Sequence, residues 1–81
     1  MSDQPSIGPI TAEKFKDEIV EFRRLLGTKE FWEDRTRYHR AVVGLGMVYV
    51  NLDHNPTETE MSWFQAALLE GEMRAQFMGA L

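Results

Sequence analysis

The two histidines, His39 and His54, are the first candidates for chemistry in this sequence. A zinc or di-iron site on helices needs ligands at spacings such as HExxH or ExxH, and neither pattern occurs. The chain has no cysteine, so it has no thiolate ligand either. Asp53 precedes His54, but adjacent residues do not ordinarily converge on one metal ion. We therefore predict no metal site, with His54 as a polar turn residue and His39 on a helix flank.

Nucleophilic catalysis needs a Ser, Thr or Cys held beside a base. Ser62 begins a predicted helix and has no histidine near it in the sequence. The glycine pair in GLG, residues 44–46, resembles part of a dinucleotide loop, but Tyr49 stands where the third glycine belongs, and the Gly-Lys-Ser/Thr of a P-loop is absent. The sequence thus predicts a protein that is not an enzyme and that binds no cofactor.

One stretch, residues 34–40, has the composition of a nucleic-acid contact. Its basic and aromatic side chains could contact phosphates and stack on a base; they are Arg35, Arg37, Tyr38 and Arg40. On a helix, however, Arg37 lies four residues after Glu33 and is expected to pair with it. On a helix, the three arginines would also point in different directions around the axis. We interpret them as a salt-bridged, solvated face and keep DNA binding as the alternative.

Charge and composition limit the classes of partner. The chain has 81 residues, a net charge of −4, 43% hydrophobic and 27% charged residues, which indicates one small globular domain. Residues 51–81 carry five acidic side chains and one basic one, so this part would repel a phosphate backbone. No apolar run approaches the length of a membrane span, and the first residues lack the pattern of a signal peptide. We expect a cytoplasmic protein without a membrane partner, and the acidic charge balance disfavours a nucleic-acid partner.

The first helix is predicted at residues 12–26. Thr11 is a suitable N-cap, and Gly27 can end the helix in the left-handed conformation. One face carries apolar residues at helical spacing: Phe15, Ile19, Phe22 and Leu26. We assign residues 1–10 to a flexible lead-in and residues 11–81 to a single helical domain.

The second helix is predicted at residues 29–50, with Thr28 as its N-cap. It includes AVVGLGMVYVNLD, residues 41–53, whose valines also fit a strand at 42–51 paired across a dimer. A helix is favoured because no other segment resembles a strand with which this one could pair. Within the helix, Gly46 is predicted to lie at a close helix crossing and Gly44 to be less constrained.

The third helix is predicted at residues 58–79, because Thr57 and Glu60 have the spacing of a capping box. Apolar and small residues recur along it at steps of three and four: Met61, Phe64, Leu68, Gly71, Ala75 and Met78. A second stripe on a neighbouring flank contains Leu69, Met73 and Phe77. Two stripes on one helix indicate more than one packing partner.

These patterns predict an all-α fold, a compact three-helix bundle that dimerises. The alternative is an α+β fold with the strand at 42–51 paired between subunits. We expect a small, non-catalytic protein–protein interaction module, an adaptor, inhibitor or assembly factor of the bacterial or phage accessory type. Aromatic and apolar residues are the candidate anchors for a protein partner: Trp32, Tyr38, Trp63, Leu69, Met73 and Phe77. A DNA-associated regulator that uses Arg35, Arg37 and Arg40 is the alternative function.

Overall fold

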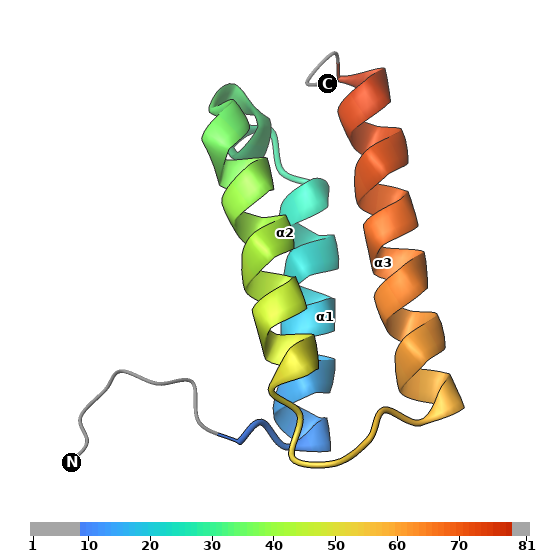
Figure 1. Cartoon of the computed structure of the whole chain (residues 1–81). Coiled ribbons are helices and arrows are strands. Elements are labelled where there is room, and N and C mark those ends of the chain that lie inside the picture. The colour runs from blue at the N-terminus through green and yellow to red at the C-terminus, as the bar shows by residue number, and fades with distance from the viewer. Residues whose placement is uncertain (1–8, 79–81) are drawn as a thin grey trace, which may run out of the picture.

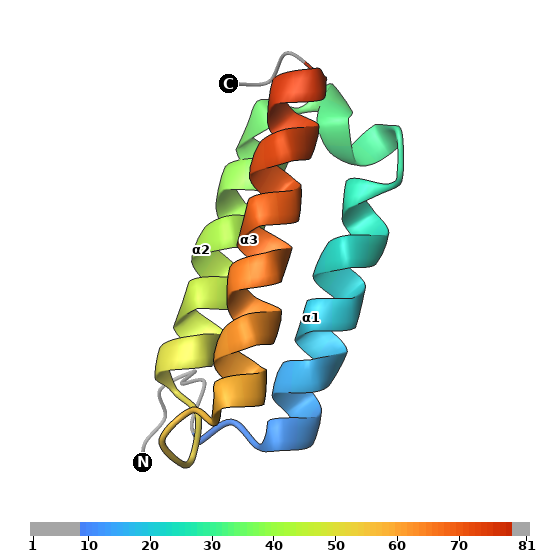
Figure 2. The same cartoon turned by 90° about the vertical axis from the view of Figure 1, so that its right-hand side faces the viewer.

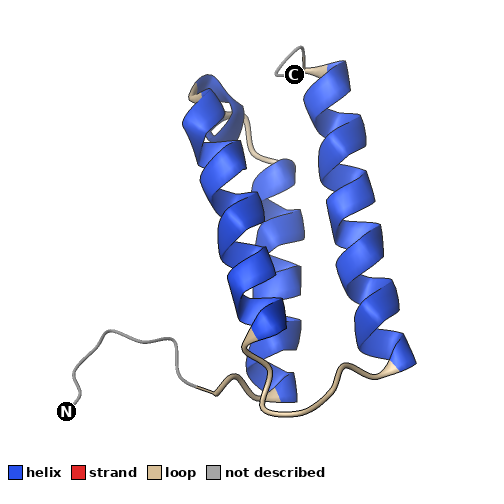
Figure 3. Ribbon diagram, viewed as in Figure 1, coloured by secondary structure: helices blue, strands red, loops and turns tan. Residues whose placement is uncertain are grey.

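Three α-helices and one short 3-10 helix follow one another along residues 9–78, the part of the chain that this computed structural model describes (Figure 1). Their bounds are α1 Ala12–Leu26, η1 Glu30–Glu33, α2 Arg35–Val50 and α3 Glu58–Phe77. Figure 3 shows every regular element of this part as a helix. The predicted all-α class and the three-helix arrangement are confirmed, whereas the dimer stays a prediction.

Helix α1 has the bounds that the sequence predicts. The Thr11 hydroxyl accepts a hydrogen bond from the Lys14 backbone N–H at 3.1 Å, which satisfies a donor of the first turn. The four residues of the predicted apolar face are all buried. Gly27 ends the helix, but at φ −93°. The predicted left-handed conformation at Gly27 is therefore wrong.

The predicted second helix begins six residues later than the sequence indicates. Thr28 is not its N-cap, because the Thr28 hydroxyl donates to the Leu25 carbonyl at 2.9 Å and stays with α1. After η1, Asp34 is extended, at φ −132° and ψ 112°. Its carboxylate accepts from the backbone N–H and the hydroxyl of Thr36, at 3.0 and 2.7 Å. Such local side-chain bonds compete with a continuous helix, so α2 starts at Arg35.

The valine-rich stretch is helical as far as Val50. The prediction for its glycines is half wrong, because a Cβ at Gly44 or Gly46 would meet no atom within 4 Å. Gly46 therefore lies at no close crossing among residues 9–78. The close approach lies instead at Gly71 of α3, where a Cβ would come within 3.2 Å of ring atoms of Phe22 and Tyr38.

Helix α3 begins with the predicted capping box. The Thr57 hydroxyl accepts from the Glu60 N–H at 3.1 Å, and the Glu60 carboxylate accepts from the Thr57 N–H at 3.0 Å. Helix α3 ends at Phe77, with Met78 as its C-cap; residue 79, the predicted end, lies outside the described residues. So do residues 1–8 of the predicted lead-in. Ile10 is buried and joins the turn after α2 through backbone hydrogen bonds with Asn51 and Asp53, both 2.8 Å long.

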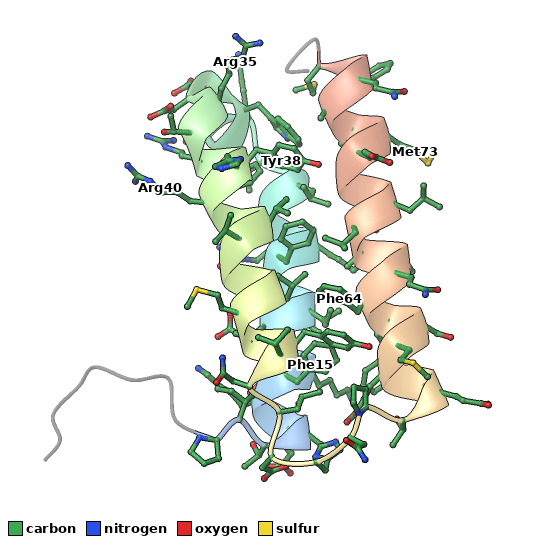
Figure 4. All side chains as sticks on the ribbon, viewed as in Figure 1. Phe15, Arg35, Tyr38, Arg40, Phe64 and Met73 are labelled. Atoms are coloured by element: carbon green, nitrogen blue, oxygen red, sulfur yellow. The ribbon has the colours of Figure 1, made fainter. Side chains whose placement is uncertain are left out.

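Helix α1 packs against both other helices and supplies most of the large core side chains. Helix α3 contributes small residues to the core, Ala67, Gly71 and Ala75, and so lies close to α1. Helices α2 and α3 meet through aromatic rings, with Tyr49 stacked on Phe64 at a centroid distance of 4.0 Å. Figure 4 shows Phe64 pointing toward α1, where Phe15 lies.

Candidate functional site

The face of α3 that points away from the bundle is apolar, and its side chains are large. Leu69, Met73 and Phe77 are 57%, 62% and 83% exposed, and Ala66 lies one turn before Leu69 and is also exposed. We call these four residues the outer stripe. Figure 2 looks onto α3 from outside the bundle, and Figure 4 shows Met73 on the side away from α1 and α2. The predicted second stripe of α3 therefore points into solvent.

The outer stripe forms the floor of a shallow furrow along α3. The furrow is lined by the four residues of the stripe together with Glu70 and Arg74. These two charged residues are one turn apart and lie on the flank of α3 nearer to α1, because Glu70 accepts a hydrogen bond from Arg23 of α1 at 2.8 Å. The furrow thus has an apolar floor and, on one side, a rim with one acidic and one basic group.

Helix α2 carries a second, smaller exposed apolar stripe. Val43, Met47 and Val50 recur on its outward face, and all three are exposed. No charged side chain occurs from residue 41 to residue 52. Gly44 and Gly46 flank this stripe, and in the described part of the chain a Cβ at either position would meet open space. It is shorter than the outer stripe of α3, and no aromatic side chain on it is exposed.

The three other candidate anchors, Trp32, Tyr38 and Trp63, lie at the edge of the core. All are half-buried and pack against the buried cluster. The Trp32 indole N–H donates to the Leu26 carbonyl at 2.9 Å, and its ring lies 5.2 Å from that of Tyr38. These contacts fix the two rings within the bundle. Of the six predicted anchors, Leu69, Met73 and Phe77 form one continuous surface. Trp32 and Trp63 are not part of that surface, and Tyr38 meets Leu69 in a separate hollow between α2 and α3.

The arginines at the start of α2 do not form one continuous basic surface. Arg37 donates to the Glu30 carbonyl of η1 rather than to the predicted Glu33 carboxylate, because the extended Asp34 separates η1 from α2. Hydrogen bonds from Thr36 lower the pKa of the Asp34 carboxyl, and the charges of Arg37 and Arg40 lower it further. The positive charge here is thus partly balanced by Asp34. Figure 4 shows Arg35 and Arg40 extending from α2 at separate points.

His54 has a role that the sequence reading missed. Its Nδ1 lies 2.6 Å from an Asp53 carboxylate oxygen, and its Nε2 lies 2.9 Å from a Glu60 carboxylate oxygen. A ring between two carboxylates is favoured in the protonated form, so the hydrogen bonds with Asp53 and Glu60 raise the pKa of His54. The signal was present in the sequence, since a histidine shortly before a capping box can reach its glutamate.

The described residues contain neither a metal site nor a membrane-spanning helix. Among residues 9–78, no group of three or more His, Cys, Asp or Glu side chains is placed to hold a metal ion. No helix in the same range is both long and apolar enough to cross a membrane. No family model matches the sequence, and neither a curated protein nor a solved structure is similar to it. The residues of this chain and their arrangement therefore carry the information on its function.

Proposed function

We propose that this chain is a non-catalytic protein–protein interaction module that binds its partner through the outer stripe of α3. The supporting observation is the distribution of side-chain size around that helix. Small residues face α1, whereas the large apolar residues Leu69, Met73 and Phe77 face solvent. Within the described residues, this arrangement leaves three large apolar side chains of α3 uncovered.

Apolar surface of this kind gains free energy only when a partner covers it, at about 25 cal/mol per Å² removed from water. Single exposed apolar residues are ordinary, but contiguous apolar patches mark interaction sites. Met73 lies at the centre of the stripe, and methionine adapts its shape to different contacts. Phe77 supplies a large ring of the type enriched at the centre of protein interfaces.

The furrow fits an amphipathic helix better than a small molecule. The stripe runs from Ala66 to Phe77, eleven steps along the helix, which is about 16 Å at the rise of an α-helix. All its lining residues come from one helix, so it is an open surface and not an enclosed cavity. A helix that lies along such a furrow uses anchors at helical spacing. An adaptor, an inhibitor or an assembly factor acts in this way, by occupying a surface on its partner. We assign that action to the cytoplasm, in keeping with a chain that has no cysteine.

The proposal is tested by affinity capture with three baits: the parent chain, Met73→Glu and Met47→Glu. Met47 is the matched control, because it is an exposed methionine on α2 outside the stripe. We expect the parent and Met47→Glu to retain the same proteins, including any second copy of the chain, and Met73→Glu to lose them. Retention of the same proteins by all three baits would overturn the assignment to α3.

A further inference from the structure

We infer that the occupant of the outer stripe is the outer stripe of a second copy of this chain, with the two α3 helices side by side and antiparallel. This inference rests on the proposed docking role of that face. Three features of α3 carry it: the sizes of the stripe residues, the order of the charges on the rim, and the absence of a basic residue on the opposite flank, where Glu72 lies.

Side-chain sizes on the stripe are self-complementary. In an antiparallel pair with its two-fold axis beside Gly71 and Glu72, Ala66 of one copy lies opposite Phe77 of the other. Leu69 then lies opposite Met73 of the second copy. Each of these pairs occurs twice, because a two-fold interface uses the same patch on both subunits. The small Ala66 leaves room for the large Phe77 ring, and Leu69 and Met73 are of similar size. Both pairs can therefore fill the space between the two helices.

The charged residues of the rim fit the same antiparallel alignment of the two helices. Glu70 and Arg74 lie one turn apart on one flank of the stripe, and in an antiparallel pair equal flanks face each other. Glu70 therefore lies opposite Arg74 of the second copy, again twice. The hydrogen bond from Arg23 uses Oε1 of Glu70, and we assign Oε2 to Arg74 of the second copy.

A parallel pair is disfavoured by the same residues. In a parallel pair opposite flanks face each other, so Glu70 would face the flank that carries Glu72 in the second copy, and the two Glu70–Arg74 pairs would not form. The antiparallel pair also opposes the two helix dipoles, which is the favourable arrangement. Because one helix per chain makes the contact, it is smaller than the roughly 800 Å² per partner of a standard interface. We expect a reversible dimer with a micromolar dissociation constant.

The test uses charge reversal and mixing, measured by sedimentation equilibrium. Arg74→Glu places Glu70 opposite a glutamate, and Glu70→Arg places two arginines opposite each other. Each variant alone is expected to dimerise at least tenfold more weakly than the parent. An equimolar mixture is expected to regain dimerisation close to that of the parent, because both pairs are restored between unlike chains. Lys16→Glu, on the exposed side of α1, is the control and should dimerise like the parent.

Folding is checked separately, because Glu70→Arg also removes the contact with Arg23. Circular dichroism of each variant must match the parent, and Arg74→Glu leaves the Arg23 contact in place. A parent that is monomeric at high micromolar concentration overturns the inference, and so does a mixture that fails to regain dimerisation. If the parent is monomeric but still captures a protein that Met73→Glu loses, the proposed function stands with a different partner. If neither dimer nor captured protein is found, both proposals fall.

Discussion

At the scale of single residues, His54 couples the turn after α2 to the start of α3. Its ring lies between the exposed Asp53 and the Glu60 carboxylate, whose side chain is only 6% exposed. Glu60 also accepts from the Thr57 N–H, and this backbone bond, followed by the contact with His54, lowers the pKa of Glu60. The contact among Asp53, His54 and Glu60 therefore makes a contribution to stability that depends on pH.

We expect stability to decline on the alkaline side through His54. Its pKa is raised in the folded chain, foremost by Asp53 and then by Glu60. Its contribution is therefore complete below the unfolded value of about 6.5 and is lost as pH rises through the folded pKa. Urea unfolding at a series of pH values from about 5.5 to 8.5 should show a decline for the parent that His54→Gln removes.

The control for this prediction is His39→Gln, which changes the exposed histidine of α2. It should keep the alkaline decline of the parent. Equal pH slopes for the parent and His54→Gln would contradict the role of His54. The sign is reversed at acid pH, where Glu60 titrates. Because the pKa of Glu60 is lowered in the folded chain, its contribution to stability is complete above about pH 4.3. That contribution is lost as pH falls through the folded pKa.

The glycines of the bundle should respond in opposite ways to a methyl group. Gly44→Ala and Gly46→Ala meet open space, so each should stabilise the fold by up to about 1 kcal/mol through helix propensity. Gly71→Ala gains the same propensity but crowds Phe22, which is buried, and Tyr38, which is held by Trp32. Because overpacking costs about 1–3 kcal/mol, Gly71→Ala should destabilise by about 1 kcal/mol net. Thermal and urea unfolding of the three variants would measure this, and a stabilising Gly71→Ala would contradict the close crossing.

The packing and contacts of single residues were only partly predictable from the sequence. The small residues of α3 were assigned to a packed seam, and Gly71 does lie at a close approach. The choice of Gly46 as the crossing residue was wrong, because periodicity gives the face of a residue within its helix but not the distance to the neighbouring helix. The contacts of His54 were not predicted, because a histidine shortly before a capping box can reach its glutamate only if the turn follows a path that the spacing alone does not fix.

At the scale of elements, the capping box of α3 should carry measurable stability. Thr57→Ala removes the acceptor for the Glu60 N–H and should destabilise the chain by about 1 kcal/mol. Thr59→Ala is the matched control, since Thr59 is an exposed threonine in the first turn of the same helix. Equal urea midpoints for the two variants would contradict the role of the cap.

Helix boundaries were predictable where the signal is local. Thr11 and Thr57 cap their helices as expected, because a cap depends on residues within one turn. The start of the second helix was not predicted correctly. Thr28 and Asp34 are both suitable caps by type, and the choice between them depends on η1, in which Phe31 is buried and packs against Trp32 and Tyr38. That tertiary packing cannot be derived from spacing alone.

At the scale of the whole molecule, the bundle can be stable without the outer stripe. The core is built around α1, and α3 meets it through Ala67, Gly71 and Ala75. The double variant Leu69→Ser and Met73→Ser should therefore change the free energy of unfolding of the monomer by less than about 0.5 kcal/mol, as exposed substitutions do. Urea unfolding at low protein concentration measures this without a contribution from association. A large loss of stability would show that the stripe belongs to the core.

The presence of two stripes on the third helix was predictable, because the apolar residues of α3 recur on two flanks. The sequence also favours Leu69, Met73 and Phe77 as the partner-binding stripe, but it does not show how far each stripe is covered by the other helices. Both are apolar, and only the structure shows that α1 covers the small residues while Leu69, Met73 and Phe77 remain exposed. The aromatic anchors Trp32 and Trp63 remain predictions, placed at the edge of the core by the structure.

The central claim is that a protein occupies the outer stripe, and site-specific photo-crosslinking tests it most directly. A benzophenone side chain is placed at Met73 in one chain and, as the control, at Val20, an exposed apolar residue on α1. After illumination in cells of the source organism, we predict a discrete protein adduct from position 73 and none from position 20. Mass spectrometry of that adduct separates a second copy of the chain from another protein. Equal labelling from both positions, or no adduct from position 73, would contradict the claim.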